Sequence, residues 1–381
     1  MVAPKLRFKE FDGDWILNNI GKFLIEYKEK VPSSTEIEIY SSSREGLKPQ
    51  KDYFDNRELQ NFGEYGVVPP NYFTYRHMSD DTTFKFNINS IGKKIAVSKE
   101  YPVFTTNENL DSQFLLLKLN GSNDFKKFAI EQKKGGTRTR LYFKALCTWE
   151  TRLPSISEQT KIASFLSAVD EKISQLTQKH ELLSQYKQGM MQKLFSQQIR
   201  FKADDGSEFG EWEEKELHQI FQIKAGGDIE KSSVSEVRTS EFSYPIFANS
   251  DKNKGFYGWA NKFKYKEAVT VTGRGNLGIA VARNEPFYPI VRLLVLLPLV
   301  KQNLKFFEEQ INLLDIVSES TGVPQLTAPQ LSKYKVNVPS LEEQTKIANF
   351  LSAIDQKIGV VAQQIEHAKQ WKKGLLQQMF V

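Results

Sequence analysis

The chain contains one segment twice, and this internal repeat limits its possible folds more than any other feature. Residues 154–173 match residues 339–358 at 15 of 20 positions without a gap, an offset of 185 residues. The same offset still aligns Phe195 with Phe380. A repeat at half-chain spacing predicts two copies of one structural unit.

A shorter motif opens each copy. Arg7, Phe8 and Trp15 stand in the first copy where Arg200, Phe201 and Trp212 stand in the second. The order of opening motif, body and repeated segment therefore occurs twice. It predicts a first body in residues 1–153, a first helical segment in 154–198, a second body in 199–338 and a second helical segment in 339–381.

The repeated segment has the apolar spacing of a long coiled-coil helix, with steps of three and four residues. The seam residues are Leu166, Val169, Ile173, Leu176, His180 and Leu183 in the first copy and Leu351, Ile354, Ile358, Val361, Ile365 and Ala368 in the second. Ser155 with Glu158, and Ser340 with Glu343, predict a capping box at each start. Two rods with matching seams are expected to pack antiparallel, each following its own body.

The bodies between the helices are predicted to be mixed α/β and rich in strands. Runs with β-type composition or alternation lie at residues 36–40, 82–87, 95–97, 114–119, 268–272, 279–282 and 291–297. The two bodies share little sequence, whereas their edges repeat. The predicted fold class is therefore α+β, with two mixed α/β domains joined by two long antiparallel helices and an internal pseudo-two-fold repeat.

Several short motifs suggest catalysis but lack what the chemistry needs. Residues 273–278 match G-x-G-x-x-G, yet the following Ile279-Ala280-Val281-Ala282 predicts a strand, whereas a dinucleotide site needs a helix there. Val68 precedes Pro69-Pro70 where an adenine methyltransferase needs Asn or Asp. There is no phosphate-binding G-x-x-x-x-G-K-[ST] loop, and the four histidines and one cysteine have no metal-ligand spacing. We expect no cofactor, no metal and no catalytic residue.

Composition favours a binding protein with an anionic partner. The formal charge is +6 and the pI is about 9.0, which is a mild indication of nucleic acid. The longest apolar stretch, residues 290–300, contains Arg292 and Pro298 and is too short to span a bilayer. With one cysteine and no signal-type N-terminus, a cytoplasmic protein without membrane contact is expected.

Clusters of basic, polar and aromatic residues in both bodies are candidate DNA contacts, since Arg and Asn read base edges and Lys neutralises phosphate. In the first body they are Tyr75, Arg76, His77, Lys93, Lys94, Arg138 and Arg140. In the second body they are Asn249, Lys254, Tyr257, Trp259, Lys262, Arg274 and Asn276. The alternative for any single member is a solvated loop or a packing aromatic.

The doubled pattern Pro-x-x-x-Glu-Gln-x-x-Ile-Ala-x-Phe-Leu-Ser-Ala-hydrophobic-Asp, with Arg-Phe before Trp at the head of each copy, resembles the specificity subunits of type I restriction-modification systems. The resemblance implies two target-recognition domains, each reading one half of a bipartite site in double-stranded DNA. It implies that residues 159–194 and 344–379 form spacer helices that dock two methyltransferase subunits, and that translocase-nuclease subunits join them. It does not fix which residues contact bases.

Two other classes remain open on the sequence. A nucleotide-dependent enzyme would rest on the glycine motif, and binding of a dinucleotide would support it. A structural coiled-coil scaffold would have no DNA role. A gel shift on random duplexes separates both from a DNA reader.

Overall fold

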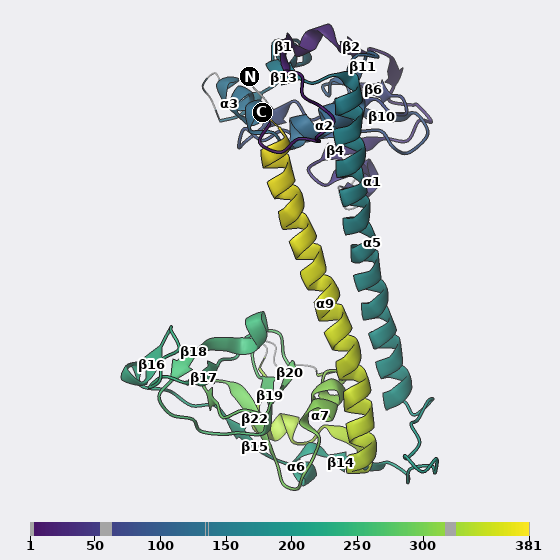
Figure 1. The fold of residues 1–381 in the computed structure, drawn as a ribbon. Helices are drawn as coiled ribbons and strands as arrows, with labels where there is room; N and C mark the ends of the chain where they lie inside the picture. Colours follow the sequence, from purple (N-terminus) through teal and green to yellow (C-terminus); the bar gives the residue numbers. More distant parts are fainter. Residues whose placement is uncertain (1–3, 54–62, 134, 136, 317–324, 381) are drawn as a thin grey trace. The chain divides into compact units, whose positions relative to one another are not determined.

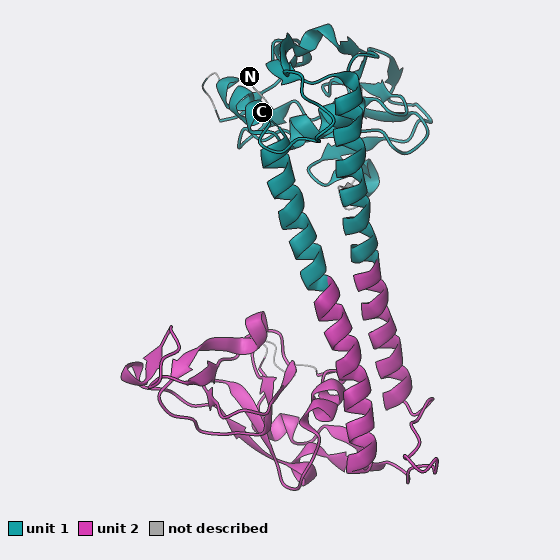
Figure 2. Cartoon of the chain, in the orientation of Figure 1, with its two compact units in different colours: residues 1–178, 362–381 teal, residues 179–361 magenta. Residues whose placement is uncertain are grey.

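The computed structural model describes residues 4–53, 63–133, 135, 137–316 and 325–380. The chain forms two compact units, the first made of residues 1–178 and 362–381 and the second of residues 179–361 (Figure 2). Each unit contains one body together with the adjoining parts of two long helices. The repeat in the sequence is therefore a repeat of whole units.

The two long helices are α5 (Ile156–Phe195) and α9 (Leu341–Met379) (Figure 1). Because the beginning of α5 and the end of α9 belong to the same unit, the helices run antiparallel, as expected. The predicted seam is buried at Leu166, Val169, Leu351, Ile354, Val361 and Ile365. It is partly buried at Ile173, Leu176, Leu183 and Ile358.

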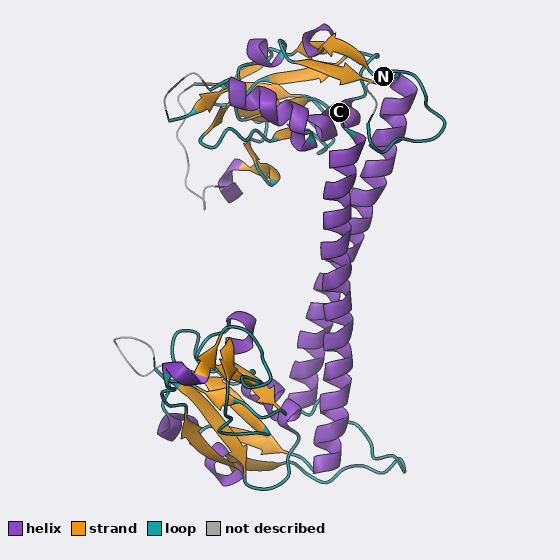
Figure 3. Cartoon of the chain, turned by 60° about the vertical axis from the view of Figure 1, so that its left-hand side comes forward, coloured by secondary structure: helices purple, strands orange, loops and turns teal. Residues whose placement is uncertain are grey.

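The first body is built from short antiparallel strands (Figure 3). One sheet has the order β2 (Leu24–Glu26), β11 (Val103–Thr106), β7 (Phe73–Tyr75), β9 (Phe86–Ile88), and another β10 (Ile95–Ser98), β6 (Glu64–Val68), β3 (Lys30–Pro32). Three pairs are β4 (Tyr40–Ser43) with β5 (Gly46–Pro49), β8 (Met78–Ser79) with β12 (Thr139–Arg140), and β1 (Ile16–Asn19) with β13 (Glu150–Leu153). The helices are α1 (Gln50–Tyr53), α2 (Ser112–Gly121), α3 (Asn123–Glu131) and α4 (Phe143–Leu146).

The second body has two four-stranded sheets. Their orders are β15 (Phe221–Ala225), β22 (Leu293–Pro298), β19 (Ala268–Thr272), β20 (Ala280–Arg283), and β16 (Val234–Ser235), β18 (Phe256–Ala260), β17 (Tyr244–Phe247), β21 (Tyr288–Pro289). The pair β14 (Glu213–Glu216) with β23 (Lys335–Val338) repeats the β1–β13 pair of the first body. The helices are α6 (Leu217–Ile220), α7 (Leu304–Ile311) and α8 (Ala328–Leu331).

Three of the predicted strands are wrong or misplaced. Residues 114–119 lie inside α2, whose N-cap Asp111 accepts a hydrogen bond from the backbone N–H of Phe114 at 2.8 Å. Residues 114, 115, 118 and 119 are buried, which is helical spacing that a short apolar run does not reveal. Residues 36–40 and 82–87 are mostly loop, and the strands there are β4 and β9.

The repeated glutamate joins the opening motif to the start of each long helix. In the first unit, Arg7 donates two hydrogen bonds to Glu158, at 2.8 and 2.7 Å, and Trp15 Nε1 donates a third at 3.2 Å. In the second unit, Arg200 donates two to Glu343, at 3.0 and 2.8 Å, and Trp212 Nε1 donates a third at 3.0 Å. Both carboxylates are buried. The same three residue types therefore form the same joint twice.

This joint corrects the predicted capping boxes. The serine halves are formed, because Ser155 and Ser340 accept from the backbone N–H of Glu158 and Glu343 at 3.4 and 3.3 Å. The glutamate side chains, however, accept from Arg and Trp, so the reciprocal half of the box is absent at both described helix starts.

The glutamine that follows each glutamate ties the long helix to a second helix of the body. The Oε1 atom of Gln159 accepts from the backbone N–H of Asp111, the N-cap of α2, at 2.9 Å. Its equivalent Gln344 accepts from Asn303, the N-cap of α7, at 3.0 Å. The two glutamines also donate at 3.0 Å to the carbonyl of the proline that precedes their helix. Each Glu-Gln pair therefore fixes one body on its helix.

An ion pair between the long helices occurs once in each unit. Lys372 contacts Asp170 at 2.6 Å in the first unit, and Lys187 contacts Asp355 at 2.7 Å in the second. Both members of one pair lie 185 residues from their equivalents in the other. The aspartate that ends the repeated motif thus links α5 to α9. Together, the repeated residues attach each body to its long helices.

Candidate nucleic-acid interface

The glycine motif of the second body is the tight turn of the β19–β20 hairpin. Gly275 and Gly278 have φ values of +72° and +81°, which favour glycine. A Cβ atom on Gly273 would lie 2.7 Å from the carbonyl oxygen of Arg292. Because strand β20 and not a helix follows, the turn interpretation is confirmed and a dinucleotide site is excluded here.

The amide of Asn249 holds this turn in place. Its Oδ1 accepts from the backbone N–H groups of Gly273 and Arg274, at 2.6 and 3.1 Å, and its Nδ2 donates to the carbonyl of Arg274 at 2.7 Å. Reading adenine requires an amide oxygen that is free to accept. In this conformation both lone pairs of Oδ1 are in use, which favours a supporting role for Asn249, and its contact with a base stays a prediction.

The loop that follows Asn249 has a strained backbone, which a buried arginine holds by a hydrogen bond. Asn253 and Lys254 have φ values of +48° and +51°, and Gly255 continues the left-handed run at +78°. The carbonyl of Lys254 accepts from Arg283, whose guanidinium lies 3.5 Å from the ring centroid of Phe247. Arg283 is only 8% exposed, and burial lowers its pKa to about 10. A buried cation that holds a strained backbone indicates a loop of defined shape.

The remaining candidates of the second body fall into two groups. Lys254, Lys262 and Arg274 are exposed, and Tyr257 is 60% exposed. Trp259 is partly buried, with the guanidinium of Arg238 at 4.9 Å from its ring centroid and the ring of Phe256 at 5.4 Å. Asn276 donates to the carboxylate of Asp251 at 2.5 Å. The exposed side chains of Lys254, Tyr257, Lys262 and Arg274 are therefore free to contact a ligand. Those of Trp259 and Asn276 already contact other residues of the chain.

In the first body the structure removes one candidate. Tyr75 is fully buried, and its hydroxyl donates to the carbonyl of Leu141 at 3.0 Å, so the prediction that it contacts DNA is wrong in this fold. Tyr75 is a core aromatic on β7. The sequence pattern of this strand does not show whether its side chains are buried or exposed. His77 is also buried, its ring stacks on exposed Tyr142 at 5.2 Å, and burial lowers its pKa.

The lysines and one arginine of the first body are exposed but paired. Lys93 contacts Glu38 at 3.0 Å, Lys94 contacts Glu29 at 2.9 Å, and these carboxylates raise the pKa of both lysines. Arg138 contacts Asp80 at 2.8 Å. Exposed pairs of this kind are weak, so a phosphate can replace the carboxylate. Arg76 and Arg140 are exposed and make no ion pair with any residue that the structure describes.

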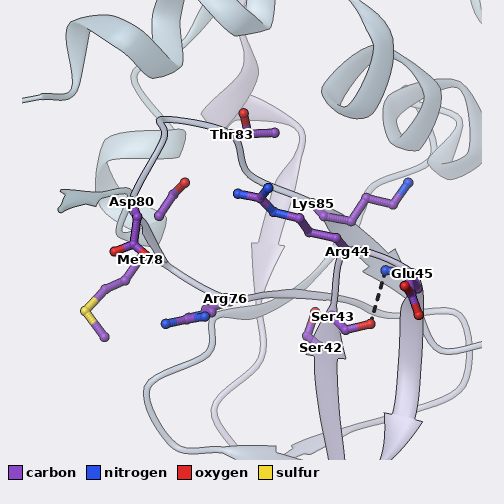
Figure 4. Close-up of a pocket in the computed structure, with 10 residues that line it drawn as sticks. Ser42, Ser43, Arg44, Glu45, Arg76, Met78, Asp80, Thr83 and Lys85 are labelled. Atoms are coloured by element: carbon purple, nitrogen blue, oxygen red, sulfur yellow. Dashed lines mark hydrogen bonds between the residues drawn. The ribbon is translucent and has the colours of Figure 1, made fainter. Parts of the chain in front are cut away.

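An open pocket of about 270 Å³ lies beside Arg76 and was not foreseen (Figure 4). Arg44 from the β4–β5 turn, Arg76 after β7 and Lys85 before β9 give it three cationic side chains. Ser42, Ser43 and Ser79 line it with hydroxyl groups. Arg44 contacts Asp81 at 2.6 Å and holds the pKa of that carboxyl well below its usual range.

Of the residues that line this pocket, Arg76 alone was a predicted DNA contact, because the pocket brings residues 42–45 together with residues 76–85, which lie about thirty positions further on. Within the described part of the chain, no His, Cys, Asp and Glu side chains gather in a group of three able to hold a metal ion. Among the same residues, no helix has the length and apolarity to cross a membrane.

A model of the type I restriction modification DNA specificity domain matches residues 55–185 and, a second time, residues 210–370. The chain belongs to this family. A putative type I specificity subunit of Mycoplasma pneumoniae is 29% identical over 220 residues, which are 58% of this chain and 59% of that relative. The match therefore spans less than two thirds of that relative's length.

Other specificity subunits are similar over nearly the whole chain. The specificity subunit of the type I restriction enzyme MjaVIII of Methanocaldococcus jannaschii is 25% identical over 415 residues, 97% of this chain and 94% of the relative. The crystal structure of a type I restriction-modification S subunit from M. genitalium has a TM-score of 0.64 at 17% identity and covers 100% of this chain and 99% of its own. At this identity the likeness concerns the fold.

The family resemblance drawn from the doubled motif is thus confirmed, and so is the fold class. Both family matches include most of a body and most of one long helix, in keeping with two copies of one unit. The comparisons name specificity subunits and not their catalytic partners, which agrees with the expected non-enzymatic role. They do not single out any of the side chains described above.

Proposed function

We propose that this chain is the DNA-sequence-reading, non-catalytic subunit of a type I restriction-modification complex. The bodies in residues 1–153 and 199–338 each read one half of a bipartite duplex site. The helical segments 154–198 and 339–381 set the spacer between the halves and bind two methyltransferase subunits, and translocase-nuclease subunits complete the restriction form.

One observation carries this proposal. The repeated residues form the joints that hold each body on its helices, whereas the exposed loops of the two bodies differ in sequence and shape. Two domains that bind different half-sites need the same attachment to the helices and different exposed loops. Exposed cations on both bodies, such as Arg140 and Arg274, supply groups for phosphate and base contact.

The role of the helices as a spacer can be tested by lengthening both. One heptad inserted after Gln178 in α5 and after the equivalent Gln363 in α9 preserves the seam and adds about 10 Å. At 3.4 Å per base pair, the unspecified spacer is expected to grow by about three base pairs while the half-site bases stay the same. Methylation sequencing of the host genome measures both. Changed half-site bases with an unchanged spacer would contradict the proposal.

Exposed aromatics at equivalent positions support binding of two copies of one partner. Tyr186 on α5 and Trp371 on α9 lie 185 residues apart and are 52% and 55% exposed. Replacing both by alanine is expected to reduce retention of the methyltransferase subunit at least tenfold in co-purification. The exposed neighbour Gln370 provides the control, since Gln370→Ala should leave retention unchanged. Full retention by the double variant would place docking elsewhere.

A further inference from the structure

The reading tip of the second body consists of two loops that are fastened to each other. We define this tip as residues 249–255 and 273–278. Asn249 binds the backbone of the second loop through three hydrogen bonds, and Asp251 accepts from Asn276. Thr272, the last residue of β19, donates from its Oγ1 to the carbonyl of Asn276 in the second loop at 2.5 Å. The shape of the tip is therefore set before any ligand arrives.

Arg274 is the side chain that this framework leaves free. Both its backbone N–H and its carbonyl are bonded to Asn249, so its Cα position is fixed. Its side chain is exposed, and among the residues that the structure describes the guanidinium has neither an ion pair nor a hydrogen bond. A pre-positioned, unpaired guanidinium is suited to the two parallel acceptors O6 and N7 of guanine.

We propose that Arg274 is a specificity-determining contact of the second body, reading a guanine in the major groove, and that Asn249 is the positioning residue that aims it. The inference rests on the proposed DNA-reading function. It adds which base the second body recognises and which residues recognise it. It also separates two side chains of the same cluster: one touches DNA, and the other acts through the first. Lys254 and Lys262, exposed on the same body, fit phosphate contacts.

A selection from a random duplex library tests this, using the full chain together with its methyltransferase subunit. Arg274→Ala is expected to lower discrimination at one guanine-containing base pair of one half-site by about 10–100-fold. The other base pairs should change by less than about twofold. Asn249→Ala should lower discrimination at that same base pair by at least about fivefold. The exposed Asn261 supplies a matched control, and Asn261→Ala should alter none of them.

The double variant distinguishes aiming from reading. If Asn249 acts through Arg274, adding Asn249→Ala to Arg274→Ala changes the selected sequence no further, because the group being aimed is already gone. Asn249→Asp keeps the oxygen that accepts the two N–H bonds and should retain most of the discrimination. This variant also keeps the test open if Asn249→Ala unfolds the body, which circular dichroism would reveal.

Four results would overturn the inference. Uniform weakening across all sequences by Arg274→Ala would make it a phosphate contact. An effect of Asn249→Ala at a different base pair, additive with Arg274→Ala, would make Asn249 a reader. If the unaltered complex selects no sequence, the proposed function fails and this inference falls with it, whereas a selected sequence that both variants leave intact refutes the inference alone.

Discussion

Replacing Glu343 with alanine is expected to lower the free energy of unfolding of the second unit by about 3–5 kcal/mol. Its carboxylate is fully buried and accepts two hydrogen bonds from Arg200 and one from Trp212. Removing it leaves the Arg200 guanidinium, whose side chain is 23% exposed, without its charge partner. A buried ion pair that loses one member costs far more than its net contribution when intact.

The neighbouring Glu342 gives a matched control for this change. It lies in the same first turn of α9 but is exposed, so Glu342→Ala should cost less than about 1 kcal/mol through the helix dipole alone. Urea unfolding followed by circular dichroism measures both. Equal losses for the two variants would show that the joint contributes little. Glu158→Ala should repeat the large loss in the first unit, where Arg7 and Trp15 make the same contacts.

The sequence predicted well what depends on local pattern. The helical seam and the glycine turn follow from residues close together in the chain, and the repeat follows from matching two segments directly. All three are present in the structure. The repeated Glu, Gln, Phe and Asp were identified as a family signature, but their contacts were not predicted. Most of those contacts join residues that are distant in the chain, such as Arg7 with Glu158, 151 positions apart, which no spacing rule reaches.

The candidate site was predicted less well for the same reason. Tyr75 and Arg76 are adjacent in sequence, yet Tyr75 is buried and Arg76 is exposed. Tyr75 ends β7, which lies between two strands of its sheet, whereas Arg76 lies just beyond the end of that strand. Asn249 has the right chemistry for adenine, but its amide is used by a turn 24 residues away. The pocket around Arg44 needs three separate segments to meet. Composition identified a candidate cluster in each body. Only tertiary contacts distinguish the residues that are free to contact DNA from those that hold a loop or the core in place.

A buried lysine in the first unit carries the second large expected effect. Lys118 on α2 is fully buried, with its Nζ 5.6 Å from the ring centroids of Trp15 and Phe380 and 5.9 Å from that of Trp149. The carboxylate of Asp124 lies 3.7 Å away. Burial lowers the pKa of Lys118 from 10.5 to about 8. The charged form is thus disfavoured in the folded unit.

Replacing Lys118 with methionine is expected to stabilise the first unit by about 2–3 kcal/mol at pH 7. The change in pKa from 10.5 to about 8 corresponds to about 3 kcal/mol at about 1.36 kcal/mol per unit. Methionine keeps the length of the side chain and packs well against aromatic rings. Exposed Lys127 on α3 is the control, because Lys127→Met removes the same charge without a desolvation penalty.

The pH dependence gives this prediction its sign. Between about pH 8 and 10.5 the unfolded chain keeps the proton of Lys118 and the folded unit has lost it, so stability rises with pH across that window. Below pH 8 both states are protonated and the penalty for burying the charge is present in full. The Lys118→Met variant lacks this group, so the difference in unfolding free energy between it and the unaltered chain should shrink from pH 8 to pH 10.5. A difference that stays constant, or a variant less stable at pH 7, would mean that the three rings and Asp124 compensate the buried charge completely.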